Sequence, residues 1–129
     1  PRESATKEVD LALLSLIYPY KIIDEEGTKL ILKNIEEKLV REKGVIRYVG
    51  DQYYHDNGEA QWTFGFPWLA IIYRELGNKE KYNYFLNKTM DIMTIDDEMP
   101  ELYLAESKVA NENTPLGWAQ GMVLLAMEN

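Results

Sequence analysis

The feature of this sequence that most constrains its fold is an alternation between two kinds of predicted helix. Residues 9–17, 62–76 and 115–127 are apolar nearly all round, whereas residues 28–40 and 79–93 carry an apolar stripe on one face only. A helix that is apolar all round is buried on every side, and an amphipathic helix shows one face to water. The order along the chain is therefore buried, amphipathic, buried, amphipathic, buried.

Two concentric layers of helices produce this order, because inner helices touch neighbours on all sides and outer helices do not. A simple bundle predicts an amphipathic stripe on every helix instead. Five such helices do not close a ring, and three nearly all-apolar helices leave a large apolar surface. The sequence therefore predicts an all-α fold that is a wedge of an α/α barrel. We expect its exposed inner helices to favour self-association.

The ends of two predicted helices carry local signals. Pro67 lies inside the third helix, so this helix either starts near Phe66 or is kinked there. Thr114 is the expected N-cap of the last helix, with Pro115 at its first position. Residues 44–49 form at most one short strand, which does not change the fold class.

Two long connections, residues 41–61 and 94–113, each lead from an outer helix to an inner one. They are therefore expected to open at the same end of the barrel. Long loops in a compact domain are usually functional, so this end is where a site is expected.

The composition limits the partners and the chemistry. The 14 basic and 22 acidic residues give a net charge of -8 without a cluster of Lys and Arg, so no nucleic-acid partner is expected. The chain has no cysteine and one histidine, His55, which disfavours a zinc site; neither a metal nor another cofactor is expected. No apolar run approaches the roughly 20 residues that span a bilayer, and no signal peptide is recognised. We expect a cytoplasmic protein without a membrane partner.

One acidic residue lies on a stiffened backbone between two predicted helices. Pro100 fixes its own φ and pushes Met99 towards an extended conformation, so Glu101 has few conformations to lose. Such a loop can hold a carboxylate in position without burying it in a core. The neighbouring residues 96–98 are interpreted as a solvated turn; their clustered oxygens could instead bind calcium, although the spacing matches no known calcium loop.

Residues 47–62 mix aromatic side chains with Arg, Asp and Asn. A sugar ring offers C–H faces that stack on an aromatic ring and hydroxyls that need both donors and acceptors, so this mixture suits carbohydrate. The same Tyr and Trp side chains could instead cap the core beneath a long loop, and composition alone favours that interpretation.

Three segments, in order, carry a resemblance to a known family. Arg47 to Trp62 is similar to the pattern Arg-Tyr-x-x-Asp-x-Tyr-Tyr…Trp, and Gly58 to Gly77 is similar to Gly-Glu-Gly…Trp-Leu…Leu-Gly. Met99-Pro100-Glu101, followed by residues 114–119, is similar to Leu-Pro-Glu-Gln and then Pro-Leu-x-Trp-x-His-Ala. These patterns belong to the C-terminal part of the glucoamylase family, glycoside hydrolase family 15, and the resemblance spans nearly the whole chain.

The resemblance implies that residues 1–129 are the C-terminal arc of a single (α/α)6-barrel catalytic domain, a toroid of six inner and six outer helices. It implies an inverting hydrolase that releases glucose from the non-reducing ends of α-linked oligosaccharides or polysaccharides. Glu101 would be the general base and Arg47 a ligand of sugar hydroxyls. Asp51, Trp62 and Tyr48 would also bind the substrate.

The family's general acid lies upstream of the matched segments, so this chain would hold half of an active site and would not hydrolyse glucosides alone. Two departures leave other interpretations open: Leu102 stands where Gln follows the base, and Gln120 stands where the last helix has His. One alternative is a non-catalytic regulatory or carbohydrate-binding relative, like the α and β subunits of phosphorylase kinase. Another is a helical interaction module with an aromatic core.

Overall fold

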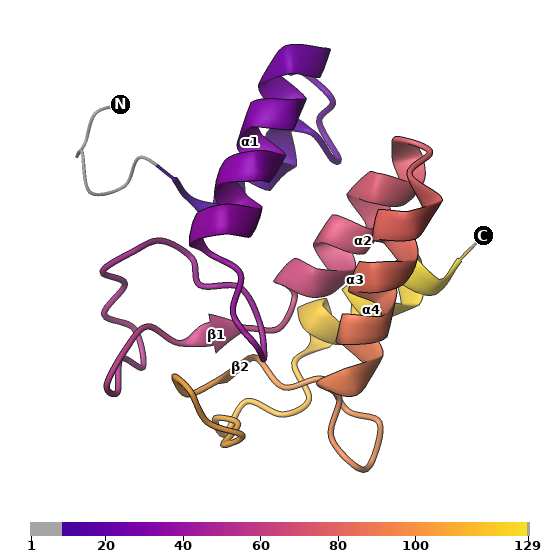
Figure 1. Cartoon of the computed structure of the whole chain (residues 1–129). Coiled ribbons are helices and arrows are strands. Elements are labelled where there is room, and N and C mark those ends of the chain that lie inside the picture. Colours follow the sequence, from indigo (N-terminus) through magenta and orange to yellow (C-terminus); the bar gives the residue numbers. More distant parts are fainter. Residues whose placement is uncertain (1–8, 129) are drawn as a thin grey trace.

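A computed structural model describes residues 9–128 and shows a mainly helical fold, as predicted. The helical segments in this part of the chain are a 3-10 helix, η2 (Leu11–Leu16), and the α-helices α1 (Glu25–Lys38), α2 (Gly65–Glu75), α3 (Lys79–Asp91) and α4 (Gly117–Met127). Two short strands, β1 (Gln61–Trp62) and β2 (Leu102–Tyr103), lie at one end of the molecule (Figure 1). No helix within residues 9–128 is long and apolar enough to cross a bilayer.

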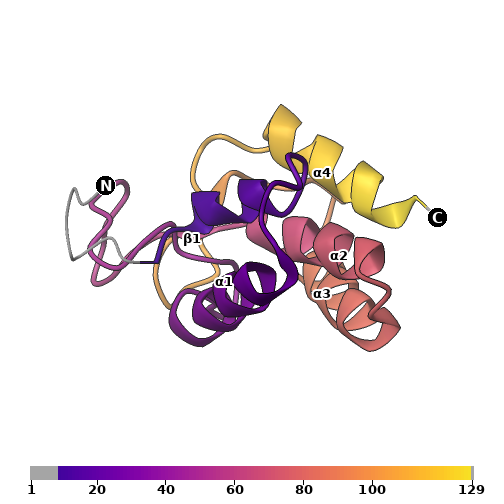
Figure 2. The same cartoon turned by 90° about the horizontal axis from the view of Figure 1, so that it is seen from above.

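The helix α2 lies at the centre of the molecule. It packs against η2, α3 and α4, and every residue from Gly65 to Tyr73 is buried. Seen from above, α2 runs between α4 on one side and α3 on the other (Figure 2). The helix begins just before Pro67, which therefore sits in the first turn, where a missing N–H breaks no helical hydrogen bond. The predicted buried helix is confirmed, and of the two alternatives for Pro67 a helix start near Phe66 is correct, since the helix begins at Gly65.

The helices α1 and α3 each bury one face and expose the other, as predicted for outer helices. Their buried residues are Thr28, Leu32, Ile35, Phe85 and Thr89. Each helix has a side-chain cap: Asp24 accepts a hydrogen bond from the N–H of Gly27 at 2.7 Å, and Asn78 accepts one from the N–H of Lys81 at 3.0 Å.

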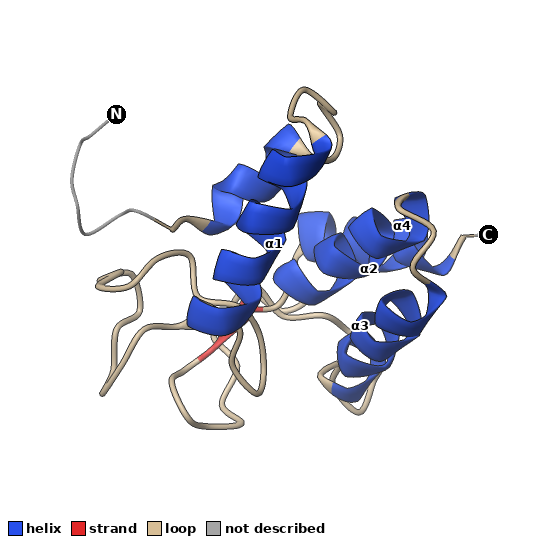
Figure 3. Cartoon of the chain, turned by 45° about the horizontal axis from the view of Figure 1, so that its top comes forward, coloured by secondary structure: helices blue, strands red, loops and turns tan. Residues whose placement is uncertain are grey.

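A groove of about 620 Å³ is lined by residues of α1, α2 and α3. Figure 3 shows α1 above the layer of loops and apart from α2 and α3. Glu36 of α1 spans this groove by accepting hydrogen bonds from the hydroxyl of Tyr73 on α2 and the ammonium of Lys81 on α3. Burial, together with the hydrogen bond to Glu36, raises the pKa of Tyr73. These contacts tie the first part of the chain to the helical core.

The first helix differs from the prediction in type and length. Instead of an α-helix over residues 9–17, the chain forms a 3-10 helix over Leu11–Leu16, in which Asp10 accepts a hydrogen bond from the N–H of Ala12 at 2.8 Å. Side chains three residues apart eclipse in a 3-10 helix, so one row faces the core. Leu11 and Leu14 form that row and are buried, whereas Ala12 is exposed. The predicted α-helix was wrong for this segment, which buries only one row of side chains within residues 9–128.

The last helix begins at Gly117, two residues later than predicted. Leu116 is the N-cap, and its N–H donates to the carbonyl of Met99 at 3.0 Å. Thr114 was expected to cap the helix, but its hydroxyl donates to a carbonyl in the preceding loop, and Pro115 lies outside the helix. The prediction was wrong because this segment is hydrogen-bonded to the loop that carries residue 101.

The helix α4 buries one face against α2 and α3. Its buried residues are Ala119, Val123 and Ala126, whereas Trp118, Leu124, Leu125 and Met127 are exposed. No element within residues 9–128 buries these four side chains, which agrees with the apolar surface predicted for an incomplete ring. Burial of this face in a larger barrel stays a prediction. The described helices do not close into a ring, and the larger (α/α)6 toroid stays a prediction.

The two long connections meet at one end of the molecule, as predicted. The strands β1 and β2 are antiparallel, with Gln61 opposite Tyr103 and Trp62 opposite Leu102. Val45 exchanges two backbone hydrogen bonds with Trp62, at 2.9 and 3.0 Å. Instead of the short strand considered for residues 44–49, the chain forms this isolated bridge. The pairing holds the two loops beside each other below the helices (Figure 1).

Candidate functional site

The backbone around residue 101 is hydrogen-bonded on both sides. The N–H of Glu101 donates to the carbonyl of Asn113 at 2.9 Å, and the carbonyl of Glu101 accepts from the N–H of Thr63 at 3.2 Å. The buried hydroxyl of Thr63 also donates to the carbonyl of Pro100 at 2.5 Å. Met99 and Pro100 are buried while Glu101 is half-buried, so the loop presents one carboxylate from a fixed backbone.

One oxygen of the Glu101 carboxylate receives all of its hydrogen bonds. Oε1 accepts from the side-chain amide of Asn111 at 2.7 Å, from that of Asn113 at 2.9 Å and from the hydroxyl of Tyr53 at 3.5 Å. No residue of the described part of the chain donates a hydrogen bond to Oε2. A general base must have an oxygen that is positioned and available to accept a proton. In this arrangement Oε1 is held by hydrogen bonds and Oε2 is available.

Arg47 and Asp51 form a bidentate ion pair. The Arg47 Nε lies 2.6 Å from Asp51 Oδ2, and Nη2 lies 2.8 Å from Oδ1. Asp51 is 1% exposed and the Arg47 side chain is 37% exposed. Burial raises the pKa of Asp51, but hydrogen bonds from Arg47 and from the backbone N–H of Tyr53 outweigh it and bring that pKa below its usual value. The hydrogen bond to Asp51 raises the pKa of Arg47, so the pair is fully charged at neutral pH.

Aromatic rings surround the guanidinium group of Arg47. Its Cζ lies 4.6 Å from the ring centroid of Trp62, 5.4 Å from that of Tyr53 and 6.0 Å from that of Tyr48. Tyr53 stacks on Trp62 with 5.4 Å between the ring centroids. Trp62 is buried and forms the back of this cluster, whereas Tyr53 is 40% exposed. These are cation–π geometries, and they hold the Arg47 guanidinium against the partly exposed ring of Tyr53 and the buried ring of Trp62.

Tyr53 connects the arginine cluster to the carboxylate. Its ring contacts Arg47 and Trp62, and its hydroxyl lies 3.5 Å from Glu101 Oε1. Burial, followed by the charge of Glu101, raises the pKa of Tyr53, while the charge of Arg47 lowers it. The residues predicted from the sequence, Glu101, Arg47, Asp51, Trp62 and Tyr48, therefore lie in one region. Their functional roles stay predictions.

The sequence did not reveal the two amides that hold the carboxylate. Asn111 and Asn113 follow Glu101 by ten and twelve residues and return beside it because Tyr103 forms a bridge with Ala110. A hairpin pattern after Glu101 would have placed the two amides beside it. The strand β2 has only two residues, which is too short for such a pattern to be recognised.

The two departures from the family pattern have structural roles. Leu102 is fully buried in β2, so its side chain points into the core. The side-chain carbonyl of Gln120 accepts a hydrogen bond from the N–H of Met99 at 2.9 Å, which fastens the start of the Glu101 loop to α4.

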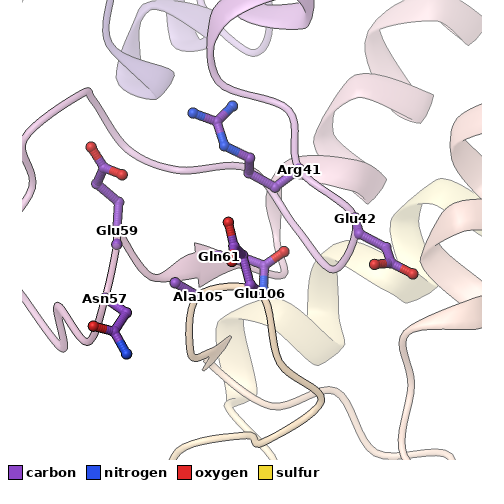
Figure 4. Close-up of a pocket in the computed structure, with 8 residues that line it drawn as sticks. Arg41, Glu42, Asn57, Glu59, Gln61, Ala105 and Glu106 are labelled. Atoms are coloured by element: carbon purple, nitrogen blue, oxygen red, sulfur yellow. The ribbon is translucent and has the colours of Figure 1, made fainter.

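A separate depression of about 220 Å³ lies in the loop layer (Figure 4). It is lined by Arg41, Glu42, Asn57, Gly58, Glu59, Gln61, Ala105 and Glu106, none of which is a predicted site residue. The Gln61 amide is used within the protein, since it accepts from the N–H of Lys43 at 2.8 Å and donates to the carbonyl of Leu104 at 2.9 Å. Within residues 9–128, no group of three His, Cys, Asp or Glu side chains could hold a metal ion.

Comparison with known proteins relates this chain to part of a larger protein. No protein-family model matches the chain. Over 135 aligned residues it is 31% identical to a Methanocaldococcus jannaschii protein named as an uncharacterized glycosyl hydrolase. The chain is a distant homologue of part of a glycosyl hydrolase. The alignment covers 92% of this chain and 21% of that relative.

Solved glycosidase structures share the fold. A wild-type glycosidase matches with a TM-score of 0.76 at 22% identity, and a glycosidase variant in complex with glucose matches with a TM-score of 0.76 at 21% identity. Each match covers 91% of this chain and 34% of the glycosidase. The helices of this chain therefore correspond to about a third of a larger glycosidase.

Proposed function

We propose that this chain supplies the general base, but not the general acid, of a glucoamylase-like inverting hydrolase that releases glucose from the non-reducing ends of α-glucosides. The observation that carries the proposal is the carboxylate of Glu101, with Oε1 held by two amides and Oε2 free of hydrogen bonds from the described residues. Distant homology to a glycosyl hydrolase supports the reaction class. The glucose complex of a structurally similar glycosidase supports the substrate class.

In the proposed reaction, Oε2 of Glu101 accepts a proton from a water molecule as the water oxygen forms a bond to the anomeric carbon. The glycosidic C–O bond breaks on the opposite face, and a second carboxylic acid gives its proton to the leaving oxygen. Inversion needs the two carboxyl groups about 6.5–9.5 Å apart, with room for the water between them. The acid comes from the part of the larger hydrolase that lies upstream of this chain.

Arg47 is the proposed ligand of sugar hydroxyls. A guanidinium carries five N–H donors, and two of its N–H groups are used by Asp51, so the others can reach a substrate from the half-exposed side chain. Tyr53 offers a partly exposed ring for the C–H face of a sugar. Asp51 and Trp62 are buried, so they contribute by fixing Arg47 and Tyr53, and Tyr48 lies at the edge of this group.

The stereochemistry of the product tests this proposal. The full-length protein is incubated with maltooligosaccharides, and the anomer of the released glucose is followed by proton NMR before mutarotation. Inversion at an α-glucoside gives β-glucose first. Release of α-glucose, or of no glucose from any α-glucoside, would contradict the proposal.

A second candidate function is a non-catalytic relative that binds carbohydrate or regulates another enzyme. It is favoured by Leu102, whose buried apolar side chain replaces the glutamine that follows the base in the family pattern. Binding of maltooligosaccharides, seen as a change in tryptophan fluorescence, without any release of glucose would support this alternative.

A further inference from the structure

We propose that Asn111 and Asn113 are positioning residues, which hold Oε1 of Glu101 so that Oε2 faces the attacking water. The inference rests on the proposed role of Glu101 as the general base. It concerns two side chains that no motif in the sequence assigns to the site.

The side chain of Asn111 is largely buried beside Glu101. The residue is 8% exposed, and its amide nitrogen donates to Glu101 Oε1 at 2.7 Å. Its side-chain carbonyl has no hydrogen-bond partner among residues 9–128, which is unfavourable for a buried acceptor. The opposite orientation of the amide would place that carbonyl against the carboxylate. The charge-assisted bond to Glu101 therefore sets the orientation of this amide.

Asn113 contacts both the backbone and the side chain of Glu101. The backbone carbonyl of Asn113 accepts a hydrogen bond from the backbone N–H of Glu101 at 2.9 Å. Its side-chain amide nitrogen donates one to Glu101 Oε1, also at 2.9 Å. One exposed residue thus fixes the carboxylate relative to its own main chain. Tyr53 adds little, because its hydroxyl lies 3.5 Å from the same oxygen.

The segment between the two amides is fastened from both sides. The N–H of Asn111 donates to the carbonyl of Leu102 at 3.1 Å. Glu112 accepts a hydrogen bond from the hydroxyl of Tyr54, which belongs to the other long loop. Both donor amides are therefore carried by a fixed backbone, as a positioning role requires.

The test uses steady-state kinetics of the full-length protein on a maltooligosaccharide, with substitutions at Asn113 because this side chain is exposed. Asn113→Ala is expected to lower kcat about tenfold and to leave KM within about twofold, since the base loses its fixed direction but the sugar contacts remain. Asn113→Asp keeps the shape but places a second carboxylate beside Glu101, so it is expected to lower kcat further. The control is Asn87→Ala on the exposed face of α3.

Comparing kcat of Asn113→Asp with kcat of Asn113→Ala separates an electrostatic role from a structural one. A side chain that only fills space would tolerate the isosteric aspartate better than alanine, so wild-type kcat in Asn113→Asp would overturn the inference. A rise in KM with unchanged kcat would overturn it as well. Asn111→Ala, with its unfolding temperature measured alongside, is expected to show the same loss of kcat.

The Glu101→Gln background distinguishes this inference from the proposed function. If Glu101 is the base held by Asn113, adding Asn113→Ala to Glu101→Gln brings no further loss, because coupled residues are not additive. Wild-type kcat in Glu101→Gln alone would remove the proposed function itself. Loss of activity in Glu101→Gln with wild-type kcat in Asn113→Ala would remove only the positioning role.

Discussion

Tyr54 and Glu112 join the two long loops beside Glu101. The hydroxyl of Tyr54 donates to Glu112 Oε2, and the ring of Tyr54 meets the ring of Tyr53 edge-on, with 4.8 Å between centroids. The hydrogen bond to Glu112 raises the pKa of Tyr54 to about 12, and the same bond lowers the pKa of Glu112. The contact therefore stabilises the fold when the phenol is neutral and the carboxylate is ionised.

The sign of both pKa shifts gives a prediction for stability against pH. The contribution of Tyr54 is fully present below the pKa of about 10 for an unfolded tyrosine and is lost as pH rises from there through about 12. The contribution of Glu112 is present above its unfolded pKa of about 4.3 and is lost as pH falls through its lower folded pKa. Tyr54→Phe is expected to reduce the free energy of unfolding most between roughly pH 5 and pH 10.

Urea denaturation from pH 3 to pH 11.5 measures the difference between wild type and Tyr54→Phe. Tyr84→Phe is the matched control, because Tyr84 is exposed on α3 and its hydroxyl has no hydrogen-bond partner within residues 9–128. A difference that stays constant across the whole range would show that the Tyr54–Glu112 bond does not contribute in the way the pKa shifts indicate.

At the scale of elements, β1 depends on a close backbone approach at Gly44. A Cβ atom at this position would lie 2.5 Å from the carbonyl oxygen of Trp62 and 2.8 Å from the carbonyl carbon of Gln61. Both contacts are with backbone atoms, which cannot turn aside as a flexible side chain can. Gly44 therefore allows the backbone of the preceding loop to lie against the backbone of β1.

Gly44→Ala is expected to lower the free energy of unfolding by about 1–3 kcal/mol, because the added methyl group displaces β1. The matched control is Gly121→Ala in α4, where the added Cβ would point into open space. This control is expected to raise stability by about 0.5–1 kcal/mol through helix propensity. Urea denaturation of both variants checks the prediction, and equal stabilities would contradict the account of β1.

The sequence predicts those elements whose signal is local. Periodicity found α1, α2 and α3, because each keeps its apolar pattern over at least three turns, although α1 begins at Glu25, before the predicted Thr28. It misplaced the start of α4, because Leu116 is bound to Met99 in a distant loop. Pro100 drew attention to Glu101, but only the resemblance to a family gave this one of 22 acidic residues the role of general base. Asn111 and Asn113 were missed because they reach Glu101 through pairing across a hairpin, which a helix or strand period does not encode.

On the scale of the whole molecule, the exposed apolar face of α4 has no covering element within residues 9–128. Trp118 is 59% exposed, Leu124 65% and Met127 51%. This chain spans 21% of its Methanocaldococcus jannaschii relative and 34% of the solved glycosidases. In the proposed larger barrel this face packs against neighbouring helices, so residues 1–129 alone present it to water.

Residues 1–129 expressed alone are expected to self-associate through this face, because large apolar patches drive association. Sedimentation velocity is expected to show an apparent mass that rises with concentration, and Leu124→Glu to shift the population towards monomer. Ile95→Glu is the control, since Ile95 is 96% exposed and lies in the loop after α3, outside α4. A concentration-independent monomer would contradict this prediction, and so would equal effects of the two substitutions.

The most direct test of the central claim is the rate of maltooligosaccharide hydrolysis by the full-length protein carrying Glu101→Gln, compared with Glu106→Gln, an exposed acidic residue of the same long loop. Glutamine keeps the shape of the side chain but cannot accept the proton of the attacking water. Glu101→Gln is expected to lower kcat about 100-fold or more, and Glu106→Gln to leave it near the wild-type value. Hydrolysis by Glu101→Gln at the wild-type rate would contradict the assignment of Glu101 as the general base.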